Sequence, residues 1–282
     1  MNQCCGCTLH IHEKIQRGIE RLFFRGKSTK SSAYLAYAVG NIVLMLLLFY
    51  VLLNNIVYDW TGQLYPVGSG YSLDFLSGGL DGTIPFVPEM ALFYVYLFYP
   101  MVVLTMLYFG FVEYKKGYAL SWSLVFINAI AAVAHMVFPV STYWWRQDFL
   151  AHPITGSFWA SQVYGVWAGD TSFNCFPSLH SAVSTICFFT WYRYCKAKPS
   201  ITTKFVAVGA LAIAGGVILS TFFVKQHYIA DAIAGIALAL VVGKLAFNHL
   251  WKNPSHDVEQ ETNSKGNCTS EKNSAAYTGA SS

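Results

Sequence analysis

Two histidines and an aspartate carry the chemistry that this sequence suggests. His227 and Asp231 are four residues apart near the start of an apolar run, so on a helix they share one face. A carboxylate one turn away can accept a hydrogen bond from one imidazole nitrogen and leave the other free as a base or nucleophile. Gly235, a further turn along, would keep that face narrow enough for a neighbouring helix to approach. A purely structural His–Asp hydrogen bond is the simpler alternative.

The second histidine, His180, lies at the start of another apolar run, within the string Phe-Pro-Ser-Leu-His-Ser of residues 176–181. Pro177 suits the first turn of a helix, where its missing N–H would have had no partner. Free backbone N–H groups and the positive end of the helix dipole make such an end a natural phosphate site. Ser178 lies at this end, and Ser220 closes the following apolar run on the same side.

Two cations are expected on the side of these histidines, Arg146 and Lys225. A dianionic phosphate requires a positively charged clamp of this kind. Arg146 follows Trp144 and Trp145, so an interfacial anchor is the alternative for it, and Lys225 could be a snorkelling residue at a helix end. These strings supply no carboxylate cluster of the kind that binds Mg²⁺. We therefore expect a site without a metal or other cofactor.

The elements that must position these residues are membrane helices. The chain has 282 residues, 55% of them hydrophobic and 11% charged, whereas soluble domains carry about 25% charged residues. Six stretches approach the roughly 20 residues that a helix needs to cross a bilayer. They are residues 34–53, 90–112, 119–140, 179–195, 205–224 and 228–250. We expect an all-α bundle of six transmembrane helices. Nucleic-acid binding is excluded, because basic residues do not cluster within the folded region.

The distribution of Lys and Arg predicts the orientation of the bundle. Sixteen lie on the side that holds both termini, and two lie on the other side. Both termini are therefore expected in the cytoplasm, with the histidines at the extracellular, periplasmic or lumenal face. The predicted organisation is a basic cytoplasmic segment (1–33), a membrane domain (34–252) and a disordered cytoplasmic tail (253–282), because the tail is polar and poor in apolar residues.

Two long connections, residues 54–89 and 141–178, lie on the non-cytoplasmic side, and structureless connections of that length are usually functional or disordered. Residues 154–168 are expected to lie along the membrane interface. The aromatic side chains expected to enter the lipid there are Phe158, Trp159, Tyr164 and Trp167.

The remaining histidine and cysteine residues receive structural interpretations. His135, inside the third span, is expected to form an interhelical or core hydrogen bond. Cys187 and Cys195 are expected to be buried, inert thiols. No cysteine spacing indicates a zinc site, and the cysteines at positions 4, 5 and 7 are candidates for palmitoylation.

Phe-Pro-Ser-Leu-His-Ser (176–181), followed by Ser220 and His227-Tyr-Ile-Ala-Asp231, resembles the signature of the type 2 phosphatidic acid phosphatase superfamily. Residues 84–100 are also similar to the apolar segment that precedes the site in bacterial and archaeal members. The resemblance covers residues 84–245 and is most like the branch of inositol phosphorylceramide synthases and related lipid phosphotransferases.

The resemblance implies a role for each matching residue. His227 would be the nucleophile that forms a phosphohistidine, and Asp231 would orient it. His180 would protonate the leaving oxygen. The groups that would hold the phosphate are Ser178, Ser220, Arg146 and the backbone N–H groups near residues 178–181. This scheme requires no metal.

The sequence departs from the family pattern at four positions. Pro139 stands where the first motif has Lys, and Gln147 replaces the Pro that follows its Arg. Leu179 replaces the Gly of the second motif, and Thr221 replaces the Arg that follows the serine of the last one. Our hypothesis is that Lys225 restores part of the lost positive charge. These departures favour the phosphotransferase branch.

The expected function is a lipid phosphate phosphatase or phosphotransferase that acts through a phosphohistidine. Its substrate would be a lipid phosphate or phospholipid in the membrane. Water as the acceptor makes it a phosphatase, whereas a ceramide or inositol lipid makes it a synthase of sphingolipid or related metabolism. The alternative is a catalytically inactive scaffold or lipid-binding homologue of the same fold. A channel or carrier is a third option, although only the sixth span carries an acid at membrane depth.

Overall fold

The computed structural model describes residues 39–40, 43–44, 47, 56–66, 68–170 and 172–250. Most of the first predicted span, the segment 1–33 with its cysteines, and the tail 253–282 lie outside the described residues. Within these residues the regular elements are all helical. The all-α fold class is therefore confirmed.

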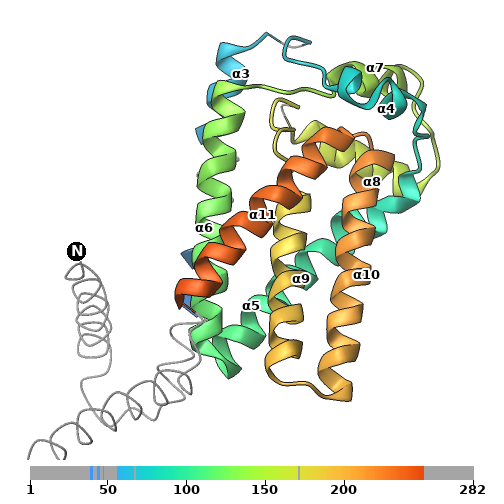
Figure 1. Ribbon diagram of the computed structural model, residues 1–282. Helices are drawn as coiled ribbons and strands as arrows, with labels where there is room; N and C mark the ends of the chain where they lie inside the picture. Colours follow the sequence, from blue (N-terminus) through green and yellow to red (C-terminus); the bar gives the residue numbers. More distant parts are fainter. Residues whose placement is uncertain are drawn as a thin grey trace, which may run out of the picture.

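The described part of the chain forms five long helices and several short ones (Figure 1). The long helices are α5 (Phe98–Val112), α6 (Tyr114–Val137), α9 (Leu179–Ala197), α10 (Ile201–Phe223) and α11 (Ile229–Leu250). A π-helical turn, η4 (Leu92–Leu97), leads into α5. The short elements are α3 (Tyr58–Leu64), η2 (Asp74–Ser77), α4 (Leu80–Thr83), η3 (Pro88–Met90), α7 (Tyr143–Ala151) and α8 (Phe158–Ala168).

Four helical segments among the described residues are long and apolar enough to cross a membrane. They are Pro88–Gly110, Lys116–Val137, Ile201–Phe223 and Ile229–Asn248. Each corresponds to a predicted span, so the chain is an integral membrane protein. A total of six spans and the cytoplasmic location of both termini stay predictions.

The predicted span at residues 179–195 forms α9 but is not among the four apolar segments. The helix lies between α10 and α11 and also packs against α5 and α6. Its Ser181, Ser184 and Thr190 are completely buried. Because neighbouring helices cover α9, polar residues on it do not face lipid, and its low hydropathy reflects its position inside the bundle.

Glycine sets the distance between α9 and α11. A Cβ added at Gly235 would lie 2.3 Å from the backbone oxygen of Ser178, and one added at Gly243 would lie 2.6 Å from the end of the Ile186 side chain. The prediction that Gly235 allows a neighbouring helix to approach is thus confirmed. Farther along the chain, α10 begins at Ile201, four residues earlier than predicted, because Ser200 and Thr203 form a capping box.

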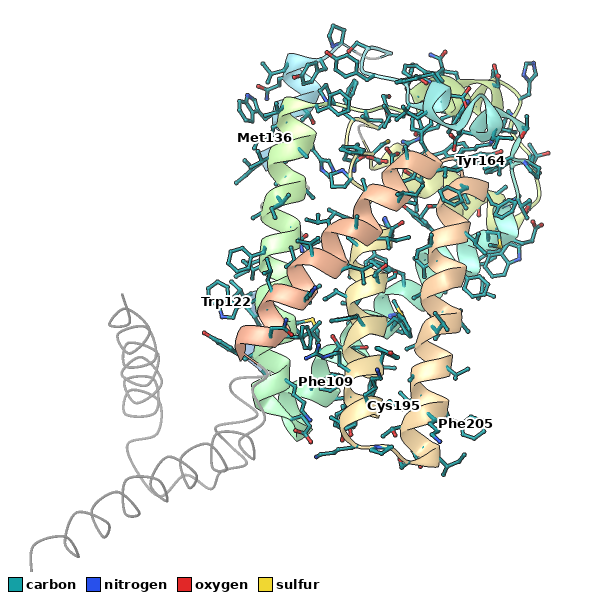
Figure 2. The ribbon with its side chains drawn as sticks, viewed as in Figure 1. Phe109, Trp122, Met136, Tyr164, Cys195 and Phe205 are labelled. Carbon is teal, nitrogen blue, oxygen red and sulfur yellow. The ribbon has the colours of Figure 1, made fainter. Side chains whose placement is uncertain are left out.

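The short helices gather at one end of the bundle, where α9 and α11 begin and α10 ends (Figure 1). Figure 2 shows Met136 and Tyr164 toward this end and Cys195 and Phe205 toward the opposite end. Helix α7 was not predicted. Cys187 is buried as expected, whereas Cys195 is partly exposed.

Helix α8 occupies the segment expected to lie along the membrane interface. Phe158 is exposed, in keeping with that expectation. The expectation is wrong for Trp167, whose side chain is 5% exposed and whose Nε1 donates to the backbone oxygen of Val224 at 3.2 Å. The physical reason is that α8 packs on η3 and on the turn after α10, so protein covers its apolar face.

Candidate active site

His227 lies in the tight turn between α10 and α11, and one nitrogen of its imidazole ring has hydrogen-bond partners in the protein. The backbone N–H groups of Gln226 and His227 both donate to the carbonyl of Thr221, at 2.9 and 3.2 Å. Nδ1 of His227 lies 2.9 Å from the backbone oxygen of Cys175. A carbonyl oxygen can only accept a hydrogen bond, so Nδ1 carries the proton. The neutral ring then has its lone pair on Nε2, which makes Nε2 the nucleophilic nitrogen.

Asp231 provides a second acceptor beside the same nitrogen. Its Oδ2 lies 3.5 Å from Nδ1 of His227 and accepts a hydrogen bond from the backbone N–H of Tyr228 at 2.8 Å. The carboxyl group is completely buried, and among the described residues Oδ1 has no hydrogen-bond partner. The predicted one-turn relation places the carboxylate beside the imidazole, although the Cys175 carbonyl is the closer acceptor.

Ser178 joins the start of α9 to α11. Its Oγ accepts from the backbone N–H of Ser181 at 3.3 Å, which caps the helix. Its own backbone N–H donates to the backbone oxygen of Asp231 at 3.0 Å. The first N–H groups of α9, at Leu179 and His180, precede the intrahelical ladder. They are therefore suited to an anion.

His180 lies in an aromatic environment close to His227. The ring centroids of the two histidines are 6.0 Å apart. Tyr94 stacks on His180 with a centroid distance of 4.2 Å, and Phe98 contacts it at 4.6 Å. The turn η4 and the start of α5 thus hold the second imidazole close to the first.

Arg146, on α7, is buried beside the turn that carries His227. Its Nη2 donates to Asp170 Oδ2 at 2.9 Å and to Gln226 Oε1 at 2.6 Å. The side chain is only 2% exposed, and its Nε has no partner among the described residues. Arg146 is therefore not a lipid-facing anchor. It reaches the neighbourhood of His227 through Gln226.

Lys225 is directed toward the connection before η3. Its Nζ donates to the backbone oxygens of Ile84 and, at 3.4 Å, Asp81, and it lies 5.0 Å from the centroid of the Trp145 ring. Burial lowers the pKa of Lys225, and the nearby Asp81 and Asp74 carboxylates oppose that shift. The snorkelling alternative is excluded because the side chain is 4% exposed. A contact with phosphate stays a prediction.

Ser220 and His135 complete the set of residues singled out from the sequence. Ser220 is buried near the end of α10, and its Oγ donates to the backbone oxygen of Val217 at 2.6 Å. His135 is also buried, and its Nε2 lies 3.4 Å from the backbone oxygen of Pro177. Of the two roles predicted for His135, the core hydrogen bond is confirmed, since Pro177 lies in the loop that precedes α9.

The family model for the PAP2 superfamily matches residues 74–245, which include every one of these groups. The chain belongs to the PAP2 superfamily. PAP2 proteins are generally metal-independent phosphatases, and the family implies phosphate-ester lipids as substrates. The match begins ten residues before the resemblance noted in the sequence and does not distinguish the inositol phosphorylceramide synthase branch. Neither the curated proteins nor the solved structures contain a match to this chain.

Sequence reasoning about this PAP2 protein missed the groups that hold the site residues in place. The Cys175 carbonyl and the Gln226 side chain carry no motif signal. Asp170 did carry a signal in the sequence. It is an acidic residue on the predicted non-cytoplasmic side, where Arg146 is one of only two expected cations. Asp81 is the least expected, since it lies 148 residues from its partner and its Oδ1 accepts the backbone N–H of Ile229 at 2.8 Å. It thereby caps the start of α11.

Cys175, His227 and Asp231 form one group of possible metal ligands in the described part of the chain, with ligand atoms within 4.8 Å of one another. Hydrogen bonds within the protein account for their closeness. Cys175 Sγ donates to the backbone oxygen of Gln226 at 3.3 Å. Burial raises the pKa of the Cys175 thiol well above its usual value, whereas a metal ligand must be the thiolate. The arrangement therefore fits a hydrogen-bonded histidine better than a metal centre.

Proposed function

We propose that this PAP2 protein transfers the phosphoryl group of a lipid phosphate through a phosphohistidine formed on Nε2 of His227. The observation that carries the proposal is the environment of Nδ1, which faces the Cys175 carbonyl at 2.9 Å and the Asp231 carboxylate at 3.5 Å. Two acceptors on one nitrogen leave the other nitrogen unprotonated. The same two acceptors would stabilise the positive charge that the ring gains when it is phosphorylated.

His180 supplies the proton transfers in this proposal. In the first step, Nε2 of His227 bonds to phosphorus while the bond from phosphorus to the lipid oxygen breaks. His180 gives that oxygen a proton, and the lipid leaves as an alcohol. In the second step, an acceptor hydroxyl loses its proton to His180 and bonds to phosphorus as the P–N bond breaks. A centroid distance of 6.0 Å between the two rings allows one phosphoryl group to contact both.

The phosphate oxygens would be held at the start of α9. The backbone N–H groups of Leu179 and His180 and the dipole of this helix favour negative charge there. The side chains that we assign to the same task are those of Ser178, Ser220, Arg146 and Lys225. In phosphoryl transfer, positioning and charge stabilisation of this kind provide most of the acceleration.

For the acceptor and for the membrane face, the proposal is supported by the sequence alone. Leu179 and Thr221, which replace the family's Gly and Arg, favour transfer to a lipid alcohol such as a ceramide or inositol lipid over hydrolysis. The distribution of Lys and Arg supports a site on the non-cytoplasmic face. A non-catalytic lipid-binding protein of the same fold is the competing function, and the His227–Asp231 arrangement argues against it.

Trapping of the phosphoenzyme tests the proposal. The purified protein is incubated with radiolabelled phosphatidate and other lipid phosphates, with and without lipid alcohols, and quenched in alkali, where phosphohistidine survives. The wild type should retain label, and His227→Ala should lose both label and turnover. His152→Ala, at an exposed histidine, is the matched control and should behave like the wild type. Normal turnover in folded His227→Ala would refute the assignment of His227 as the nucleophile. A wild type without activity on the whole panel would favour the binding protein.

The role of His180 requires a separate measurement. His180→Ala should slow turnover of lipid phosphates by about 10²–10⁴-fold, because a proton donor is lost. The defect should shrink with a nitrophenyl phosphate, whose leaving group needs little protonation. An equal defect with both substrates would mean that His180 binds phosphate and does not donate the proton.

A further inference from the structure

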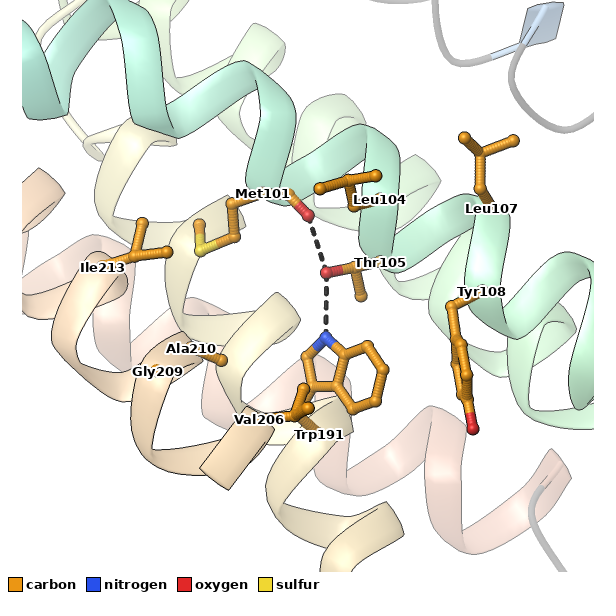
Figure 3. Close-up of a pocket in the computed structure, with 10 residues that line it drawn as sticks. All are labelled: Met101, Leu104, Thr105, Leu107, Tyr108, Trp191, Val206, Gly209, Ala210 and Ile213. Atoms are coloured by element: carbon orange, nitrogen blue, oxygen red, sulfur yellow. Dashed lines mark hydrogen bonds between the residues drawn. The ribbon is translucent and has the colours of Figure 1, made fainter. Parts of the chain in front are cut away.

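A groove lies on the lipid-facing surface of the bundle between α5, α9 and α10, outside the catalytic residues. Its volume is about 600 Å³, within the usual range for ligand pockets. Figure 3 shows Met101 and Ile213 at one end of the groove and Tyr108 and Trp191 toward the other. Leu104 on its rim is 64% exposed, so the groove opens outward.

The groove wall offers a hydrocarbon surface with no free polar group on its side chains. Thr105 Oγ1 donates to the backbone oxygen of Met101 at 2.7 Å and accepts from Trp191 Nε1 at 3.0 Å. The hydroxyl of Tyr108 donates to that of Tyr194 at 2.9 Å. Because these polar side chains already have partners, the wall cannot recognise a headgroup. It suits a saturated or isoprenoid chain.

Measured along α5 from the proposed site, the far end of the groove lies at a depth that matches the thickness of one leaflet. Phe98 contacts the His180 ring, and Met101 is the next turn of α5. Tyr108 is ten residues beyond Phe98, or about 15 Å along the helix. A lipid chain anchored at one surface spans about half of the 30 Å hydrocarbon core, also about 15 Å. A lipid whose headgroup lies at His180 therefore has a hydrocarbon chain long enough to extend along this groove.

Small residues on α10 create the space. Gly209 lines the groove, and a Cβ added there would meet no atom within 4 Å. Ala210 lies next to it and also lines the groove. The groove wall therefore lacks side-chain volume at this position, and the first carbon of a larger side chain would meet open space there.

We propose that this groove binds one hydrocarbon chain of the lipid phosphate while its phosphate occupies the site at His180 and His227. The proposal rests on the proposed function and adds that the substrate is a long-chain lipid whose chain follows α5 and α10. Chain length thereby becomes a determinant of kcat/KM, because the bound chain aligns the headgroup with the two histidines.

The kinetic test compares two substitutions on the same helix. Gly209→Leu fills the groove, whereas Gly215→Leu adds the same side chain at another α10 position where a Cβ also meets nothing within 4 Å. Gly209→Leu should lower kcat/KM for a long-chain phosphatidate by about tenfold or more and leave a dibutyryl analogue within about twofold of wild type. Gly215→Leu should leave both unchanged. Equal effects of Gly209→Leu on both substrates, or no effect on either, would overturn the proposal.

A crosslinking test does not require turnover. A phosphatidate with a photoreactive diazirine in the middle of its chain should label α5 and α10 peptides of the wild type and not of Gly209→Leu. Excess unlabelled phosphatidate should compete, whereas a phosphate-free glycolipid with the same chains should not. Equal competition by the glycolipid would identify an ordinary boundary lipid and overturn the assignment. A wild type that crosslinks in this way but releases no phosphate would instead contradict the proposed function.

Discussion

Replacement of Gly235 by alanine should separate α9 from α11, the two helices that position the proposed catalytic histidines. His180 lies on α9 and His227 immediately precedes α11. A Cβ at position 235 would lie 2.3 Å from the backbone oxygen of Ser178, 3.2 Å from Ser181 Cβ and 3.3 Å from the backbone nitrogen of Ala182. The nearest atom belongs to the backbone, so no side-chain rotation can relieve the contact.

The size of the effect follows from this distance. A contact of ordinary length is close to 3.4 Å, so the start of α9 must move about 1 Å away from α11. A displacement of about 1 Å in reacting groups costs on the order of 10²-fold in rate. The same movement stretches the 3.0 Å hydrogen bond from Ser178 N–H to Asp231 O. We therefore expect a loss of about 10²-fold in kcat together with a lower unfolding temperature.

The matched control is Gly243→Ala, on the same helix and against the same neighbour. Its Cβ would lie 2.6 Å from Cδ1 of Ile186 and 3.3 Å from a ring carbon of Phe189. The closest atom there is the end of a flexible side chain that can change its rotamer. Gly243→Ala should retain kcat within severalfold of the wild type.

The assay is initial-rate phosphate release from a lipid phosphate in detergent micelles, together with thermal unfolding of each purified variant. Gly235→Ala with normal kcat and normal unfolding temperature would refute the claim that backbone contact at this glycine sets the separation of the histidines. Equal losses in the two variants would show that any added methyl group between α9 and α11 is harmful, which also contradicts the argument.

Three further predictions concern the surroundings of the site. Asp81→Ala should remove the cap of α11 at a cost of about 1 kcal/mol, which corresponds to a fall of about 2–4 °C in unfolding temperature. Asp81→Asn keeps the accepting oxygen and should lose less stability. Identical losses in the two variants would contradict the assignment of Asp81 as a helix cap. EDTA should leave activity largely intact and vanadate should inhibit, whereas complete loss in EDTA that Mg²⁺ restores would refute the histidine mechanism. Single cysteines at the exposed positions His152 and Lys198 should react with an impermeant maleimide from opposite sides of intact cells, the first from outside, and the reverse pattern would place the site in the cytoplasm.

Local spacing in the sequence determined the features of this protein that depend on helix geometry alone. Four residues of separation predicted that His227 and Asp231 lie close together, although α11 begins at Ile229 and His227 lies in the turn before it. The start of a helix near Pro177 is local in the same sense, although Ser178 is the N-cap and Pro177 precedes the first turn. The membrane helices that contact lipid were also predictable, because the surrounding hydrocarbon selects apolar residues along their whole length.

Contacts between distant parts of the chain required the tertiary structure. The carbonyl that holds His227 belongs to Cys175, 52 residues earlier, and any residue could supply that backbone oxygen, so no side-chain pattern indicates it. The phosphate contact of Lys225 stays a prediction, and its hydrogen bonds to backbone oxygens at residues 81 and 84 were not predictable, because the loop before η3 approaches the turn only in the folded chain. Trp167 has the composition of a lipid-facing aromatic and is buried by protein. Hydropathy measures how strongly a residue prefers an apolar environment to water, whereas packing decides whether lipid or another part of the protein covers it.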